Sequence, residues 1–356
     1  MSKKNILLIS VAILLFSISA CYSEWNYLSL NIRERARFNK LYKQLGEETS
    51  YEKRFIIVRQ ILEFLTEKVT NGEINLFLTT YVEKNPDDPF NAYYLMVIAR
   101  KFREDLAFPF AVDYYERILG NYHDLMYRGN SIHFLALRDL MDIVDDDEAR
   151  ILYYKDIITR FSSHINVSEI YYRLGNTYAR IGEWDEAIQA YSNFLNSYDG
   201  SISADSYARE GIVEFLAYYN TNVNWTFESL DELVDRVIAD INSAKANGSG
   251  RLLRPNMSRV NFFTVSWEDR ERTVDPEFIA NLGVFLSPRI SISRTLDSAS
   301  NQHEAYLRTT GWSYRIPTWY LYFRRVNFPA DSEIHRNWEW AGIYLGEKPF
   351  AVSEER

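Results

Sequence analysis

The sequence repeats one pattern of side-chain sizes at a constant interval. Each copy has an Ala, a Tyr four residues later, and a Leu or Ile four residues after that. The copies are Ala111-Tyr115-Leu119, Ala149-Tyr153-Ile157 and Ala187-Tyr191-Leu195, and the interval between them is 38 residues in both cases. Side chains four residues apart lie on one face of a helix, and a long sequence period is typical of stacked repeats. We therefore predict a row of helical hairpins, with each Tyr packed behind a close helix crossing at the Ala.

The best-defined hairpin is expected between Ser168 and Gly200, with a turn at residues 182–185. Apolar residues recur at intervals of three and four on both helices. They are Tyr171, Leu174, Tyr178 and Ile181 on the first helix, and Ala187, Ile188, Tyr191, Phe194, Leu195 and Tyr198 on the second. The small residues Gly175 and Ala187 are expected to let the two backbones approach closely.

The spacing in this hairpin resembles a known repeat family. Tyr171-x2-Leu174-Gly175-x2-Tyr178, followed by Ala187-x3-Tyr191, is similar to the tetratricopeptide repeat, or TPR. Residues 199–200, Asp-Gly, stand where that family usually has Pro. A period of 38 residues also exceeds the family's usual length of about 34. We therefore expect lengthened turns or helices, with residues 102–109 as one such insertion.

The resemblance implies a TPR-like α-solenoid over residues 50–246. Residues 50–86 are expected to form the first hairpin, and residues 207–211 repeat the spacing of residues 171–175. A last helix, with an apolar face, is expected over residues 230–241. This gives four repeats and a degenerate fifth, and such repeats are stable only when they stack.

The N-terminus has the order of a secretory signal peptide over residues 1–20. Lys3 and Lys4 precede an apolar run that is too short for a comfortable membrane span, and small residues follow it. Ile18-Ser19-Ala20-Cys21 resembles a bacterial lipobox, which implies lipidation of Cys21, the single Cys of the chain. The alternative is an ordinary cleaved signal that ends near a Cys. The favoured interpretation places the protein in a bacterial cell envelope, lipid-anchored to a membrane and facing the periplasm or the exterior.

Two segments are expected to connect the parts of the chain. Residues 21–49 form an anchor-proximal segment, with a short helical pattern whose apolar positions are Ile32, Ala36 and Leu41. Residues 243–250 are small, polar and Gly-rich, and they predict a linker or an exposed loop.

Residues 260–356 are expected to form a smaller β-rich domain, such as a small barrel or sandwich, which makes the fold class α+β. Asp275-Pro276 predicts the start of a short helix, with Asp as its cap and Pro at its first position. Short runs of aromatic and β-branched residues predict strands at residues 262–267, 284–286, 290–293, 306–309, 318–326 and 338–345.

The net charge of −9 and the lack of a Lys/Arg run argue against a nucleic-acid partner. Tyr is the most frequent aromatic residue, with 26 copies, and is expected to fill the seams between stacked helices with its hydroxyl in water. The five His residues have no metal-binding spacing, and no catalytic or cofactor-binding motif is present. The sequence therefore predicts no enzyme activity, metal or cofactor.

Two polar clusters each have two interpretations. The run of residues 145–148, Asp-Asp-Asp-Glu, is either a cation site or the cap and first turn of a helix, and the second is favoured; residues 185–186 have the same explanation. Asp297, His303 and Glu304 are either catalytic or ligating residues or part of a solvated loop, and the loop is favoured because no orienting group is evident.

The family resemblance also implies a binding surface. In TPRs the first helices line a concave face that holds peptides, and the matching positions are Glu169, Tyr172, Asn176, Ala179 and Arg180. Asn176 matches an Asn with which some members hold a peptide carboxylate, whereas Tyr172 replaces their Lys. We predict a partner-binding patch of Tyr172, Asn176 and Arg180, with Arg138 from the preceding repeat. The alternative is a solvated inner surface that binds nothing specific.

A second candidate surface is the aromatic segment of residues 312–325. Alternation places Trp319, Leu321 and Phe323 on one face of a strand, and Tyr320, Tyr322 and Arg324 on the other. Such a strand is either buried on both faces or exposes a surface that binds glycan or peptide. Burial is favoured.

Two functions follow from these expectations. The favoured one is a lipid-anchored scaffold or adaptor that binds a protein or peptide partner through the TPR groove. By analogy, TPR lipoproteins of this layout assist outer-membrane assembly or accompany solute transporters. The alternative is an envelope enzyme or glycan-binding protein with its site in the β-rich domain.

Overall fold

The computed structural model describes residues 25–200, 206–267, 272 and 274–349. The expected signal peptide and Cys21 lie outside these residues. The chain divides into two compact units, Met1–Ile170 and Tyr171–Arg356, and each is described by itself. Within the described residues, no helix has both the length and the apolar character needed to cross a membrane.

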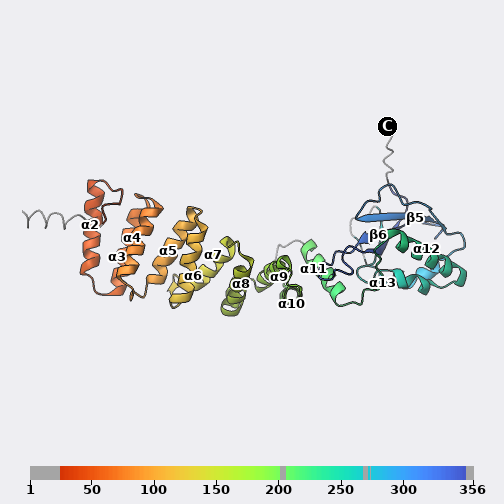
Figure 1. Ribbon diagram of the computed structural model, residues 1–356, viewed down its shortest axis with the longest axis horizontal. Coiled ribbons are helices and arrows are strands. Elements are labelled where there is room, and N and C mark those ends of the chain that lie inside the picture. Colours follow the sequence, from red (N-terminus) through yellow and green to blue (C-terminus); the bar gives the residue numbers. More distant parts are fainter. Residues whose placement is uncertain (1–24, 201–205, 268–271, 273, 350–356) are drawn as a thin grey trace, which may run out of the picture. The chain divides into compact units, whose positions relative to one another are not determined.

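The first unit is a series of helices in which sequence neighbours pack against each other, α2 on α3, α3 on α4, and so on to α8 (Figure 1). The predicted hairpins are α3–α4, α5–α6 and α7–α8. The bounds are α2 (Ile32–Glu47), α3 (Tyr51–Thr66), α4 (Asn71–Lys84), α5 (Asn91–Glu104), α6 (Phe108–Asn121), β1 (Met126–Tyr127), β2 (Asn130–Ser131), α7 (Ile132–Ile143), α8 (Asp147–Phe161) and α9 (Val167–Ile181), which continues into the second unit. The helical part of the predicted α+β fold is thus confirmed.

Local sequence signals explain where several of these helices begin and end. The Thr70 side chain accepts a hydrogen bond from the Glu73 N–H, and Glu73 reciprocates, so α4 begins with a capping box. Asp146 accepts from the Ala149 N–H at 2.7 Å and caps α8, which confirms the capping interpretation of residues 145–148. The α4 helix ends at Lys84, immediately before the Asn-Pro pair at residues 85–86.

The segment before the first hairpin is part of the folded body, and its predicted apolar face was wrong. Ile32 is 90% exposed, whereas Phe38 is buried. The reason is Trp25, which is buried with its ring 4.9 Å from that of Phe77 on α4 and 6.3 Å from that of Phe38. This aromatic cluster selects the face of α2 that carries Phe38 and Leu45, because burying large rings releases the most apolar surface from water.

The extra length of the repeat lies elsewhere than expected. Residues 105–107 form a short turn between α5 and α6, so residues 102–109 contain no insertion. The additional residues lie between α6 and α7, where the connection of residues 122–131 contains the small antiparallel β1–β2 ladder. The period was therefore lengthened between hairpins, not within one.

The recurring tyrosines are buried as predicted, but their hydroxyls bond to protein side chains: two bond to carboxylates of other helices, and Tyr191 bonds to the Asn176 amide of its own hairpin. Tyr115 on α6 donates to Asp139 of α7 at 2.9 Å, and Tyr153 on α8 donates to Glu116 of α6. Asp139 is buried and also pairs with Arg100 and Arg103 of α5. A buried carboxylate needs such partners because desolvation of an unpaired charge is costly. These bonds therefore tie neighbouring hairpins together.

In the second unit, the predicted hairpin is formed by α9 and α10 (Trp184–Ser197). Gly182, at φ +84°, makes the turn between them. A Cβ placed on Gly175 would lie 2.6 Å from the ring of Tyr191, which confirms the predicted close approach at this position. Ile181 is 41% exposed and does not belong to the buried face.

Among its described residues, the rest of this unit contains three α-helices, two 3-10 helices and a five-stranded mixed sheet in the order β3-β7-β6-β5-β4. The β3–β7 pair is parallel and the other pairs are antiparallel. The elements are α11 (Ser206–Tyr219), α12 (Leu230–Asn247), η2 (Gly250–Asn256), β3 (Phe263–Ser266), α13 (Pro276–Ala280), η3 (Leu282–Phe285), β4 (Ser291–Ile292), β5 (Glu304–Thr310), β6 (Thr318–Arg325) and β7 (Trp338–Leu345).

The sheet is open, so the predicted barrel or sandwich was wrong. The expected strand at residues 284–286 is instead largely the 3-10 helix η3, whereas the other predicted strands are present. Asp275 caps α13 by accepting from the Phe278 N–H, as predicted. The strand β6 is buried on both faces, which confirms the favoured interpretation of its aromatic residues.

The last predicted repeat helix, α12, belongs to the core of the sheet. Val237, Ile241 and Ala244 are fully buried in one cluster with Leu321 and Trp340 of the sheet. Residues 243–247, expected to begin a linker, complete α12, and Gly248 ends it in the left-handed conformation. The degenerate fifth repeat is therefore absent, since α12 buries its apolar face on strands instead of on another hairpin.

The close approach at Gly175 gives a direct test of hairpin packing. We expect Gly175→Ala to lower the free energy of unfolding by about 1–3 kcal/mol, because the new methyl group would displace the Tyr191 ring. Gly211 on α11 is the matched control, because nothing lies within 4 Å of its added Cβ. Gly211→Ala should raise the free energy of unfolding by about 0.4–1 kcal/mol in the same urea titration. Equal effects at the two positions would contradict the packing described.

Candidate functional site

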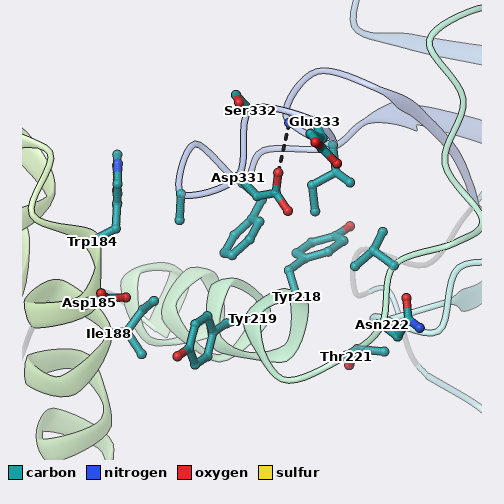
Figure 2. Close-up of a pocket in the computed structure, with 14 residues that line it drawn as sticks. Trp184, Asp185, Ile188, Tyr218, Tyr219, Thr221, Asn222, Asp331, Ser332 and Glu333 are labelled. Carbon is teal, nitrogen blue, oxygen red and sulfur yellow. Dashed lines mark hydrogen bonds between the residues drawn. The ribbon is translucent and has the colours of Figure 1, made fainter.

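A hollow of the second unit lies between α10, α11 and the loop that follows β6 (Figure 2). Its volume is about 770 Å3, which is within the usual range for ligand pockets. The lining residues are Trp184, Asp185, Ile188, Tyr218, Tyr219, Thr221, Asn222, Val223, Phe328, Ala330, Asp331, Ser332, Glu333 and Ile334. We call this the acidic-aromatic pocket.

Aromatic rings form one continuous contact series beside this pocket. The ring of Trp184 lies 6.1 Å from that of Phe215, and Phe215 lies 4.9 Å from Phe328. Phe328 in turn stacks on Tyr218, with their centroids 5.9 Å apart. Trp184 stands at the start of α10 because the turn at Gly182 ends there, so the hairpin turn itself positions the first ring. The pocket therefore has a wall of packed rings.

Carboxylates lie at the rim of the acidic-aromatic pocket. Asp185 is exposed in the first turn of α10, where its charge suits the helix dipole. Across from it, Asp331 accepts a hydrogen bond from the Glu333 N–H at 2.9 Å, which fixes the turn that carries both acids (Figure 2). No Lys or Arg is among the described lining residues, and none of the described ion pairs involves Asp185, Asp331 or Glu333. The rim is therefore negatively charged.

A buried network holds the α11 side of the pocket in place. Glu339 of β7 is fully buried and accepts hydrogen bonds from the Tyr218 hydroxyl at 2.5 Å and the Trp225 indole at 2.9 Å. It also pairs with Arg324 of β6 at 2.9 Å, and Arg324 pairs with Glu214 of α11 at 2.7 Å. One carboxylate thus connects α11, the segment after it and two strands.

The electrostatic environment of this network keeps the Tyr218 hydroxyl protonated and the Arg324 guanidinium charged. Burial, and then the neighbouring Glu339 charge, raise the pKa of Tyr218, so its hydroxyl remains a donor. Burial alone would lower the pKa of Arg324, but Glu339 and the other acidic neighbours outweigh it and raise this pKa. The guanidinium therefore stays charged beside the buried carboxylate, and the Tyr218 wall of the pocket is rigid.

The predicted partner-binding residues make contacts inside their own hairpin. Tyr172 is half-buried, with its ring 5.6 Å from that of Phe194, and Asn176 accepts a hydrogen bond from the Tyr191 hydroxyl at 2.9 Å. Arg180 donates to the Thr177 hydroxyl at 3.3 Å. Asn176 and Arg180 are nevertheless exposed. Arg138, also exposed, is in the first unit, 3.7 Å from Asp139.

The acidic and His residues singled out after β4 have separate partners. Asp297 pairs with Lys348 at 3.1 Å, and Glu304 accepts from the Tyr322 hydroxyl at 3.2 Å. His303 lines a different cavity, among whose described lining residues neither acid appears. In the part of the chain that the structure describes, no group of three His, Cys, Asp or Glu side chains has metal-binding geometry.

Sequence reasoning missed the acidic-aromatic pocket because its walls come from distant segments. Trp184 and Asp185 were assigned to a hairpin turn and a helix start, and the Phe328–Glu333 loop carries no recognisable motif. Only the contact between α11 and the sheet brings them together, and a large Trp at the exposed end of a turn was the one available signal. No protein-family model matches the chain, and no curated protein sequence matches it. The chemistry of these residues is therefore the basis for assigning a function.

Proposed function

We propose that this protein is a lipid-anchored scaffold of a bacterial cell envelope that holds a segment of a partner protein. Its helical hairpins in series are compatible with a TPR-like solenoid, which is a fold used for binding partners. The signal-like N-terminus and the single Cys21 support the envelope location and the anchor. The acidic-aromatic pocket is the observation that carries the proposal, because it offers a defined place for a peptide side chain.

The pocket chemistry favours a basic segment with an apolar neighbour. Aromatic rings attract Lys and Arg side chains through their electron-rich faces, and they also bury the methylene groups of these side chains. The carboxylates of Asp185, Asp331 and Glu333 supply complementary charge at the rim. Because Asp185 and Glu333 are exposed, each adds only a modest share of the affinity, and the rings supply the rest.

Asn176 and Arg180, which are exposed, are proposed with Tyr172 as a second contact for the same partner, and Arg138 of the first unit is proposed as a separate contact. Deletion of residues 260–356 would not be a clean test of where the partner binds. Such a truncation would strip α12 of the strands on which it is buried and would remove Glu339 from the network around Tyr218. Point substitutions on the surface are therefore the appropriate variants.

Binding of a basic peptide tests the pocket. The probes are two labelled ten-residue peptides with the same Leu and Tyr residues, one with three Lys and the other with three Glu. We expect the Lys peptide to bind in fluorescence anisotropy, and the double variant Asp185→Asn/Glu333→Gln to weaken it about 5- to 30-fold, as expected for two exposed charge contacts.

The control removes the same charge elsewhere in the unit. Glu186 and Glu228 are exposed and do not line the pocket, so Glu186→Gln/Glu228→Gln should leave the affinity within about twofold. Equal losses in the two double variants would show that only net charge matters. Equal binding of the Lys and Glu peptides would likewise contradict a basic ligand.

The anchor is tested separately through Cys21. In a bacterial host, the native chain should fractionate with membranes, and its N-terminal peptide should begin at an acylated Cys21 in mass spectrometry. Cys21→Ser should release the protein to the soluble fraction without a change in peptide affinity. An unmodified Cys21 in the exported native chain would refute the anchor while leaving the pocket proposal intact.

A further inference from the structure

A second cavity, of about 480 Å3, lies at the end of β6 in the second unit. Among the described residues it is lined by Gln302, His303, Arg325 and Arg336. None of these residues lines the acidic-aromatic pocket. The two sites therefore differ in place and in sign of charge, and neither argument depends on the other.

Backbone pairing fixes the two arginines of this cavity. Arg325, the last residue of β6, donates its N–H to the His303 carbonyl at 3.0 Å, which joins the end of β6 to the segment before β5. Arg336 donates its N–H to the Val326 carbonyl at 2.9 Å across the β6–β7 connection. The cavity walls are thus held by main-chain bonds to the sheet.

The Arg325 side chain is also held in one position. Its guanidinium lies 4.4 Å from the centroid of the Trp338 ring and donates to the Arg336 carbonyl. A guanidinium that is stacked on a ring and bonded on one edge loses little further freedom when it binds a ligand with its remaining N–H groups. The group is therefore organised in advance for an acceptor.

Arg336 adopts a backbone conformation that side chains rarely take. Its φ is +69°, in the left-handed region that favours Gly. Non-Gly residues are kept in this region mainly where the surrounding structure imposes it, and such residues are concentrated at binding sites. A Gly would adopt this φ without strain. The position nevertheless carries an Arg, and the Arg side chain lines the cavity.

The positive charge of the cavity is not neutralised within the described residues. No carboxylate there forms an ion pair with Arg325 or Arg336, whereas the adjacent Arg324, on the opposite face of the strand, pairs with both Glu214 and Glu339. Burial, and then the neighbouring Arg336 charge, lower the pKa of Arg325. The positive charges of Arg325 and Arg336 therefore repel each other, although the net charge of the whole chain is −9. A bound anion would relieve this repulsion.

We propose that the cavity lined by Arg325, Arg336, His303 and Gln302 binds a phosphate group. The Gln302 amide donates one N–H to His303 Nε2 at 3.0 Å and keeps its second N–H. Together with the N–H groups of the two guanidiniums, this gives more donors than the two coplanar oxygens of a carboxylate need, which suits the oxygens of a tetrahedral phosphate better. Gln302, His303 and Arg336 are exposed, and the volume exceeds that of a phosphate ion, so the hollow has room for the rest of a larger ligand. Its source is either a small phosphorylated molecule or a phospholipid headgroup.

Titration calorimetry of the full chain tests the proposal with defined probes at matched ionic strength. The probes are inorganic phosphate, glycerol 3-phosphate and acetate. The two phosphates should bind more tightly than acetate. Arg336→Gln should weaken glycerol 3-phosphate roughly 10- to 100-fold, as expected for loss of a charge-assisted hydrogen-bonding partner.

Two further variants separate binding from folding. Arg336→Gly should abolish the same binding and leave the protein at least as stable as the native chain, because Gly adopts φ +69° without strain. Arg294→Gln removes an exposed Arg that does not line the cavity, and it should leave the affinity unchanged. Retention of phosphate binding in both Arg336 variants would overturn the proposal.

Vesicle flotation distinguishes the two phosphate sources. The lipid arm uses the Cys21→Ser chain, so that acyl anchoring does not contribute, with vesicles of phosphatidylglycerol mixed with phosphatidylcholine. Flotation that Arg336→Gly abolishes, without glycerol 3-phosphate binding, assigns a headgroup; the reverse pattern assigns a small molecule. If no probe binds in either arm, or if chloride competes as well as phosphate, the proposal fails.

Discussion

The fully buried carboxylate of Glu339 is the interaction on which the second unit depends. It accepts from Tyr218 of α11 and from Trp225, and it pairs with Arg324 of the adjacent strand. Burying a charge is unfavourable unless its partners replace water, and these three donors do so. This bears on function, because Tyr218 belongs to this network and also forms part of the wall of the acidic-aromatic pocket. The pocket exists only because α11 is fixed to the sheet.

Much of the fold could be predicted because it is encoded locally. Ala and Tyr at spacings of four residues define helical faces, and Gly175 marks the crossing of α9 and α10 that the structure contains. Asp146 and Asp275 are short polar side chains before helical segments, and both act as caps. The strand β7 is rich in aromatic and aliphatic residues, broken by Glu339 and Gly342, and this composition suffices to identify it.

The wrong predictions share one physical cause. The apolar pattern of a helix sequence does not show which element the helix will pack against. The apolar stripe of α12 suits a hairpin or a sheet equally well, and only contact with Trp340 and Leu321 decides between them. On α2, Trp25 selected Phe38 over Ile32. The same holds for both cavities, since Arg325 and Arg336, or Trp184 and Asp331, become neighbours of one space only after the sheet and α11 assemble. Sequence spacing contains no record of such contacts.

The central claim is that α11 folds as part of the sheet unit through Glu339. Native-state hydrogen exchange of the α11 amides, in the native chain and in Glu339→Gln, tests it most directly. We predict that α11 and β6 open with the same free energy, within about 1 kcal/mol, and that the substitution lowers both by about 3–5 kcal/mol because it leaves Arg324 with a poorer buried partner. Exchange of α11 at a much lower free energy than β6, unchanged in Glu339→Gln, would contradict the account.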